Sequence, residues 1–413
     1  MLKSRYLMYR QLLLITLATI VLTGNIAIDT GGKGSVAAQV LATPVTAPAP
    51  SAPTVTLQVI PLDGSTSVIS RITASSNTDN AYADLYSEFQ KGMDYASWWQ
   101  GQYSTTSADQ SLANLKVTGT KWLGLVATCY QETYASTGIT CALERTPTDD
   151  DLVHAVTYAH SLGMKVMLKP HLDLNNDPSH WRGEIGAGFT SETQWQTWFA
   201  SYRTFINHYA DLAQAIQVEQ LAVGTELVGT SGRETDWRVV IGDVRNRFSG
   251  SITYASNHSG EETSIHWWDA VDYIGIDAYY PLTNKNNPSL AELRAAWANP
   301  ALILENLSKQ YNRPVIFTEI GYRSIDGANQ RPWEWQSGGI LDLQEQADCY
   351  HAVLETFWNK AWFRGIYWWY WSTNPNQGGV TDKDYTPFNK PAETIMKGYY
   401  LALLYLPSLL KSQ

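Results

Sequence analysis

The stretch KVMLKPH, at residues 165–171, sets the pattern from which we infer the fold. It is a short apolar run that ends in polar residues, which is typical of a strand buried on both faces. Before it, Thr148 and three aspartates open the helix-like segment LVHAVTYAHSLG, which stops at a glycine. After it, residues 191–216 have the apolar spacing of a long amphipathic helix. A strand between two helices is the repeating unit of an α/β fold.

Apolar runs of this kind recur along the chain, and each is followed by a helix-like segment. Eight such units between residues 84 and 406 predict a single (β/α)8 TIM barrel, which usually needs about 250 residues plus insertions. A doubly wound open sheet is the alternative, but no Gly-rich phosphate loop follows any run. The other runs are GMDYA at 92–96, KWLGLVA at 121–127, QLAVGTE at 220–226, SITYAS at 251–256, VDYIGIDAYY at 271–280, PVIFTEI at 314–320 and GIYWWYW at 365–371.

The N-terminal region has the three parts of an export signal. A basic stretch precedes the apolar run QLLLITLATIVLT at 11–23, and VAA at 36–38 offers a small-residue cleavage site. Residues 1–38 are therefore expected to be a signal peptide, or else an uncleaved membrane anchor built on 11–28. Residues 39–83 are expected to be a Pro/Ala/Thr-rich linker and lead-in, with room for one short strand after residue 56. Both alternatives place the barrel outside the cytoplasmic membrane, either secreted or anchored on its outer side.

The cysteines fit an exported protein without a metal site. Export permits disulfides, and Cys129 and Cys141 flank a polar loop that a disulfide would close. Cys349 lies in a helical pattern and is expected to be a buried thiol. No Cys/His spacing resembles a zinc site, so we expect neither a metal nor an organic cofactor.

Composition excludes several classes of protein. Aromatic residues make up 12% of the chain and include 17 Trp, whereas charged residues are only 16%, against about 25% on average. A disordered chain would show the reverse balance. The net charge of −10 and the lack of a basic stripe argue against nucleic-acid binding. Many amphipathic rings indicate a surface for flat, hydroxyl-rich ligands such as sugars, although core packing accounts for a good part of the Trp.

Two glutamates end strands of the predicted barrel. Glu226 ends the fourth run in VGTEL, and Glu319 ends the seventh in VIFTEIGY. Residues at the C-terminal ends of barrel strands face the active-site mouth. Two facing carboxyl groups cleave a glycosidic bond when one is protonated and the other is ionised. The alternative is that each glutamate caps a loop or forms a salt bridge, which is harder to maintain for two residues in such equivalent positions.

These residues give the chain a specific resemblance. It resembles glycoside hydrolase family 113, the β-mannanase-like family of clan A barrel glycosidases, over about 300 residues in the expected order. The resemblance implies that Glu226 is the acid/base and Glu319 the nucleophile. Many clan A enzymes have Asn before the acid/base, where it binds the sugar 2-hydroxyl, whereas this chain has Thr225. The matching stretches are GMDYASWW at 92–99, TPTDDDL at 146–152, GMKVMLKPHLD at 163–173, VGTEL at 223–227, DYIGIDAYYPL at 272–282, FTEIGYRS at 317–324, GIYWWYW at 365–371 and KPAETI at 390–395.

Other residues near the strand ends are expected to bind substrate. The clan resemblance implies that Tyr279 hydrogen-bonds the nucleophile, although Tyr279 and His171 also have core packing as an alternative. Lys169 alternates onto the face of His171 and is expected to pair with an acid. Trp371 is the preferred aromatic platform at the cleavage site. The expected substrate-binding residues are Asp94, Trp98, His171, Asp173, Trp181, Asp277, Tyr279 and Trp371.

The leading hypothesis is a retaining glycoside hydrolase that cleaves β-1,4-mannan, manno-oligosaccharides or a similar β-linked polysaccharide. A non-catalytic carbohydrate-binding barrel is the main alternative, since fold alone does not dictate function. A structural barrel at the cell surface is a third. Neither alternative needs a matched pair of glutamates, so the pair favours the enzyme.

Overall fold

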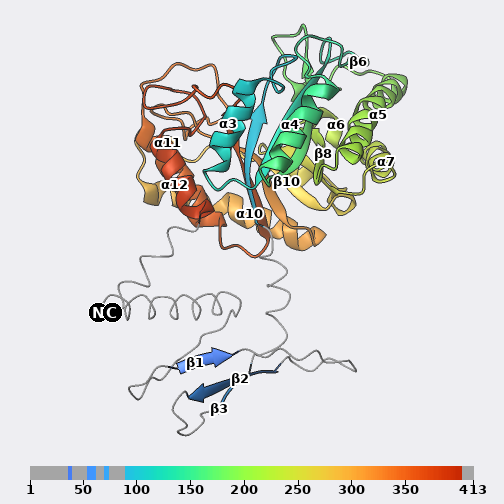
Figure 1. Ribbon diagram of the computed structural model, residues 1–413. Coiled ribbons are helices and arrows are strands. Elements are labelled where there is room, and N and C mark those ends of the chain that lie inside the picture. Colours follow the sequence, from blue (N-terminus) through green and yellow to red (C-terminus); the bar gives the residue numbers. More distant parts are fainter. Residues whose placement is uncertain (1–35, 40–53, 62–68, 74–88, 402–413) are drawn as a thin grey trace. The chain divides into compact units, whose positions relative to one another are not determined.

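The computed structural model describes residues 36–39, 54–61, 69–73 and 89–401 (Figure 1). The chain divides into two units, residues 1–87 and 88–413. In the first unit, β1 (Val36–Gln39), β2 (Thr54–Pro61) and β3 (Ile69–Thr73) form an antiparallel sheet in the order β1-β2-β3. The sequence led us to expect at most one short strand here. The expected apolar signal or anchor, residues 11–28, lies outside the described residues, and within them no helix has the length and apolarity to cross a membrane.

The second unit is a closed barrel of eight parallel strands, which confirms the predicted fold. Its strands follow the order β4-β12-β11-β10-β9-β8-β7-β5, and β4 also pairs with β5, so the sheet closes on itself. The two-residue strand β6 (Ile139–Thr140) pairs antiparallel with β5 outside the barrel. The barrel strands are β4 (Gln90–Ala96), β5 (Trp122–Gln131), β7 (Lys165–Leu174), β8 (Gln220–Thr225), β9 (Ser251–Asn257), β10 (Tyr273–Asp277), β11 (Val315–Ile320) and β12 (Phe363–Ser372).

Helices surround the strands, and side-chain caps begin several of them (Figure 1). Thr148 and Asp151 form the reciprocal capping box of α4, as the run of aspartates predicts. Ser191 caps α5, and Asp342 caps α11. The helices are α3 (Thr106–Lys116), α4 (Asp149–Ser161), α5 (Glu192–Ala215), α6 (Val228–Ser231), α7 (Glu234–Arg245), α8 (Glu261–Ser264), α9 (Leu290–Ala296), α10 (Ala298–Tyr311), α11 (Leu343–Phe357) and α12 (Pro391–Tyr400), with 3-10 turns η1 (Arg182–Glu184) and η2 (Trp268–Ala270).

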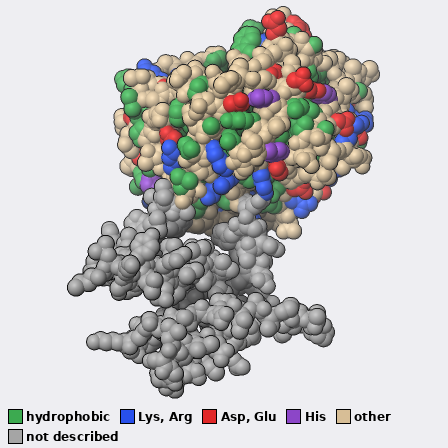
Figure 2. All heavy atoms as spheres, in the orientation of Figure 1, with side chains coloured by type: hydrophobic (Ala, Val, Ile, Leu, Met, Phe, Trp, Pro, Cys, Tyr) green, Lys and Arg blue, Asp and Glu red, His purple; other side chains and the backbone are tan. Residues whose placement is uncertain are grey.

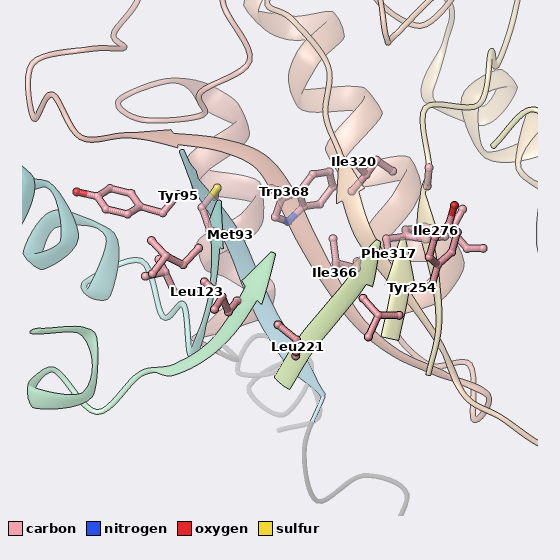
Figure 3. Close-up of a cluster of buried hydrophobic side chains, with 14 of the residues drawn as sticks. Met93, Tyr95, Leu123, Leu221, Tyr254, Ile276, Phe317, Ile320, Ile366 and Trp368 are labelled. Carbon is pink, nitrogen blue, oxygen red and sulfur yellow. The ribbon is translucent and has the colours of Figure 1, made fainter. Parts of the chain in front are cut away.

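Outward-facing strand residues pack against the helices in one large core. Figure 3 shows part of this cluster, including Met93, Leu123 and Trp368. The ring of Trp368 stacks on Tyr350 of α11, with ring centroids 3.7 Å apart. Trp198 of α5 is fully buried here, as its helical spacing predicts. Several of the Trp residues that stand out in the composition therefore fill the layer between helices and barrel.

Inward-facing residues fill the barrel itself in two layers. The lower layer is a separate apolar cluster of Trp122, Met167, Ile316 and Tyr367, each from a different strand. Interior layers of this kind make a barrel a packed core instead of a pore. The carboxyl of Asp94 also lies in the interior and is fully buried.

Gly124 leaves the space that the Asp94 carboxyl occupies. A Cβ atom on Gly124 of the neighbouring strand β5 would lie only 1.9 Å from Asp94 Oδ1. No side chain fits at this position while the carboxyl keeps its place, so the interior carboxyl depends on Gly124.

A disulfide closes the polar loop beyond β5. It joins Cys129, near the end of β5, to Cys141, just after β6. Cys349 in α11 is a free, buried thiol, as the sequence indicates.

On the face drawn in Figure 2, acidic, basic and hydrophobic side chains are interspersed with uncharged surface. Arginines around α7 are paired with acids, for example Arg238 with Asp269 at 2.8 Å and Arg247 with Asp211 at 2.8 Å. Exposed pairs of this kind contribute little to stability, but they neutralise positive charge locally.

A first prediction concerns the helix–barrel layer. Trp198→Ala should lower the free energy of unfolding by about 3–5 kcal/mol, because the large cavity cannot collapse fully. Urea denaturation followed by near-UV circular dichroism measures this change. Trp335→Ala is the matched control, since Trp335 is 68% exposed and its truncation should alter stability by less than about 0.5 kcal/mol. Equal effects for the two variants would contradict the described packing.

A second prediction concerns the interior. Gly124→Ala should destabilise the barrel by about 1–3 kcal/mol, because the added Cβ displaces the Asp94 carboxyl. Gly138→Ala is the control, since a Cβ there meets nothing within 4 Å. The melting temperatures of both variants and the wild type give the comparison, and a Gly124→Ala protein as stable as the wild type would refute the steric conflict.

Candidate active site

The two candidate catalytic glutamates lie at the C-terminal ends of β8 and β11. Glu226 directly follows β8, and its N–H donates to the carbonyl of Ala255 in β9 at 2.8 Å. Its φ is 53°, in the left-handed region that non-glycine residues adopt uncommonly. Glu319 lies within β11, where its register against β10 shifts beside Asp277. The left-handed backbone at Glu226 and the register shift beside Glu319 thus set the directions of the two side chains.

Glu226 occupies a partly buried, mixed environment, with its side chain 16% exposed. Its Oε1 accepts a 2.7 Å hydrogen bond from Asn257 Nδ2, and its Oε2 lies 3.9 Å from Arg182 Nη1. Burial raises the pKa of Glu226 and the charge of Glu319 adds to this, whereas Arg182 and Asn257 oppose the rise. The balance favours a proton on Glu226, as a general acid requires.

Glu319 is instead surrounded by hydrogen-bond donors. Lys169 Nζ donates to its Oε1 at 2.6 Å, and the Tyr279 hydroxyl donates to its Oε2 at 2.9 Å. Burial and the neighbouring Glu319 charge raise the pKa of Tyr279 well above its usual range, so the phenol keeps its proton and remains a donor. A carboxylate bound by a cation and a phenol is oriented and stabilised in its ionised form. The contact between Tyr279 and Glu319 is the one that the sequence resemblance implies.

His171 and Arg182 connect the surroundings of the two glutamates. Arg182 Nη1 donates to His171 Nδ1 at 3.1 Å, and Arg182 Nη2 donates to Asp173 at 3.3 Å. Burial, with Arg182 and Lys169, lowers the pKa of His171 well below its usual range, so the imidazole is neutral. Because a guanidinium has only donors, the imidazole proton is on Nε2, which lies 3.6 Å from Glu319 Oε1.

Two predicted substrate-binding residues are out of reach of a sugar, which corrects the sequence interpretation. Asp94 and Asp277 are fully buried. Asp277 Oδ1 accepts hydrogen bonds from Lys169 at 3.1 Å and from the Thr318 hydroxyl at 2.8 Å. Strand alternation does place both aspartates inside the barrel, but below the mouth, so Asp277 holds Lys169 instead of a ligand.

The prediction that Trp371 forms an aromatic platform at the cleavage site is also wrong. Its ring is only 2% exposed and packs on Phe388, and its indole N–H donates to the carbonyl of Ser111 at 3.0 Å. The register of β12 against β4 shifts between Trp368 and Trp371, so the alternation reverses and both rings face the helices. The Trp369–Tyr370 peptide bond within this irregular stretch is cis.

Two other predicted aromatic residues are accessible. Trp98, after β4, is 38% exposed and lies 6.3 Å from Trp369 between ring centroids. Trp181, directly before η1, is 42% exposed. Both rings have a free surface for stacking against a pyranose.

Sequence reasoning missed two residues that contact Glu226. Asn257 ends β9 and was recognisable as a polar strand end, but nothing linked it to Glu226. Arg182 lies in a loop turn, and its position next to Trp181 gave no signal of its contacts. Thr225, which stands where many clan A enzymes have Asn, is buried. The amide beside the acid therefore comes from the next strand.

Among the described residues, one acidic group has the spacing of a cation site. It comprises Asp326, Asp342 and Glu345, whose oxygens lie within 4.8 Å of one another. Glu345 accepts hydrogen bonds from the N–H groups of Gly327 and Asn329, and Asp342 caps α11. These carboxylates thus have structural roles, and none belongs to the Glu226–Glu319 pair.

Comparisons with known proteins identify the family of the barrel. The family model described as Glycoside Hydrolase Family 113 matches residues 94–390. A comparison with curated proteins found no match. A solved complex of a family 113 β-1,4-mannanase is similar with 30% identity and a TM-score of 0.70, over 76% of this chain and 99% of that one. The family 113 β-mannanase of Alicyclobacillus acidocaldarius is similar with 29% identity and a TM-score of 0.69, over 77% and 99%.

More distant structures share the fold alone. The β-glucuronidase of Ruminococcus gnavus is 12% identical, with a TM-score of 0.51 over 84% of this chain and 57% of that one. The family match, in contrast, spans both glutamates and most of the barrel. The chain therefore belongs to glycoside hydrolase family 113.

Proposed function

We propose that the protein is a retaining glycoside hydrolase that cleaves β-1,4-mannan or manno-oligosaccharides, with Glu226 as acid/base and Glu319 as nucleophile. The observation that carries this proposal is the contrast between the two carboxyl groups at one mouth. Burial favours the protonated form of Glu226, whereas Lys169 and Tyr279 donate to Glu319. A pair of carboxyl groups in opposite states is what glycosidic cleavage requires.

In the first step, an oxygen of the Glu319 carboxylate attacks the anomeric carbon as the bond from that carbon to the leaving oxygen breaks. Glu226 gives its proton to the leaving oxygen, so the departing sugar leaves as a neutral alcohol. The product is a glycosyl ester of Glu319 and an ionised Glu226. Loss of the Glu319 charge on esterification removes one cause of the raised pKa of Glu226, so it favours the ionised form of Glu226 that acts as base in the second step.

In the second step, ionised Glu226 takes a proton from water as the water oxygen attacks the anomeric carbon. The ester bond to Glu319 breaks, and Glu319 leaves as a carboxylate while Glu226 is again protonated. Two inversions at the same carbon retain its configuration. Asn257 supports both roles of Glu226, because its amide N–H binds Glu226 Oε1 whether or not the acid carries its proton.

The relatives support the choice of substrate. Two similar solved structures are described as β-1,4-mannanases, with 30% and 31% identity to this chain. Exposed Trp98 and Trp181 supply ring surfaces that suit a chain of pyranoses.

We also propose that the barrel acts outside the cytoplasmic membrane, secreted or held there by the N-terminal segment. The charged and apolar pattern of residues 1–38 supports export. The Cys129–Cys141 disulfide supports an oxidising compartment.

Glu226→Gln and Glu319→Gln should each lower kcat/KM on β-1,4-mannan by at least about 10²-fold, because each removes a proton donor or an anion needed in the transition state. Reducing-end release from mannan, cello- and xylo-oligosaccharides measures activity and substrate choice. Glu334→Gln is the control, as this loop glutamate should keep wild-type activity. If wild type binds mannan but none of the proteins hydrolyses any substrate, a carbohydrate-binding barrel replaces the enzyme.

Arg182→Met should move the basic limb of the kcat/KM profile to higher pH. The Arg182 charge opposes the raised pKa of Glu226, so its removal lets Glu226 keep its proton to higher pH. Initial rates from pH 4 to 10 locate the limb. Arg238→Met, which removes a paired arginine on α7, serves as the control and should leave the limb in place. A basic limb that remains at the wild-type pH or moves to lower pH in Arg182→Met would count against Glu226 as the general acid.

A further inference from the structure

Lys169 is a fully buried cation whose donors are all used. Its side chain extends from β7 into the barrel and has no exposed surface. Its Nζ donates to Glu319 Oε1 at 2.6 Å, to Asp277 Oδ1 at 3.1 Å and to the carbonyl of Thr318 at 3.2 Å. An ammonium group has three protons, so these acceptors fix its position.

Acidic groups surround this cation. Burial opposes the charge on Lys169, but Asp277, Glu319 and Asp94 outweigh it and raise the pKa of the ammonium group. Burial raises the pKa of Asp94 well above its usual range, and Glu319 and Asp277 add to this rise although Lys169 opposes it. Lys169 therefore remains charged, and the acid nearest to it is Glu319.

The other groups that face Glu319 do not supply a second close cation. His171, from β7, is neutral for the reasons given above. Tyr279, from β10, is an uncharged donor. Glu226, beyond β8, is an acid, and Arg182 of η1 lies against Glu226, His171 and Asp173. Among the described residues, Lys169 is thus the cation in direct contact with the nucleophile.

We propose that Lys169 is a positioning residue of the hydrolase: it keeps Glu319 ionised and fixes its carboxylate, while Asp277 and Thr318 hold the lysine in place. This inference rests on the proposed role of Glu319 as nucleophile. A cation beside a carboxylate favours the ionised form, which is the form that attacks. Burial of the whole group suits a residue that acts through Glu319 and does not touch the sugar.

The proposal assigns Lys169 a part in both chemical steps. When Glu319 attacks, a carboxylate electron pair forms the bond to the anomeric carbon, the negative charge ends on Glu226, and the Lys169 ammonium loses its anionic partner. When water attacks the anomeric carbon, the ester bond breaks and the electron pair returns to Glu319. The ammonium then stabilises the departing carboxylate, so its loss should slow breakdown of the glycosyl-enzyme.

Lys169→Met keeps most of the length of the unbranched side chain and removes its charge. The acid limb of kcat/KM should move to higher pH, because the cation that contacts Glu319 Oε1 is then lost. At the optimum, kcat should fall more than KM rises. A folded Lys169→Met enzyme with its acid limb at the wild-type pH would overturn the proposal.

Lys390→Met is the matched control. Lys390 is equally buried and donates to three acceptors, the Ser324 hydroxyl, the Asp382 carboxylate and the Asp384 carbonyl. Its replacement should cost stability without moving the acid limb. An equal movement in this control would mean that any lost buried lysine shifts the profile, which would also overturn the proposal.

Asp277→Asn tests the anchor and guards against a Lys169→Met protein that does not fold. The amide oxygen can still accept from Lys169 and Thr318. Burial and the charge of Glu319 raise the pKa of Asp277 well above its usual range, so its replacement removes little negative charge beside Glu319. The acid limb should therefore stay in place or move to lower pH. Movement to higher pH would contradict the proposed electrostatic role.

A measurement without turnover separates this inference from the choice of substrate. In protein labelled with carboxyl-¹³C glutamate, the Glu319 resonance is the one absent from Glu319→Gln. Its titration in Lys169→Met should have a midpoint at higher pH than in wild type. If that difference is found but no sugar is hydrolysed, the positioning role holds and the proposed function fails; if mannan is hydrolysed and the midpoints agree, the reverse is true.

Discussion

Closure of the eight strands into a barrel is the constraint on which the rest of the structure depends. Every second side chain must point inward, and the interior must be filled. Trp122, Met167, Ile316 and Tyr367 fill the lower part with apolar surface. Above them, Lys169 meets Asp277 and Glu319, so the charges buried near the mouth are paired. The apolar floor excludes water from this layer, and low polarity strengthens every interaction within it.

The periodicity of the chain predicted much of the fold and part of the site. Strand ends alone placed Glu226 and Glu319 at one mouth, and alternation put Lys169 beside an acid, because period-two geometry holds in regular strands. The same rule failed for Trp371, where a register shift in β12 reverses the alternation. Alternation does not show how deep in the barrel a residue lies. Asp94 and Asp277 were therefore predicted to bind substrate, although both are fully buried. The contacts of Arg182 depend on how the loop after β7 folds, and no local sequence pattern predicts that.

The Trp residues form a buried set and an exposed set. Trp198, Trp237 and Trp368 lie in the helix–barrel layer, where large rings fill the gaps between round helices and a twisted sheet. Trp98 and Trp181 instead remain accessible, in the loops that follow β4 and β7. The abundance of Trp in the composition therefore has two separate physical causes, packing and exposure at the mouth, which a total number cannot distinguish.

The turn η1 constrains how this barrel can diversify. Arg182 reaches from that turn to residues carried by β7 and β8, so a change of length in the connection that holds it should disturb the contacts of the acid. The segment around Trp333 and Trp335 carries no such contact to the glutamates and presents exposed rings. A change of length near Trp333 should therefore disturb the two glutamates less than a change of length near Arg182.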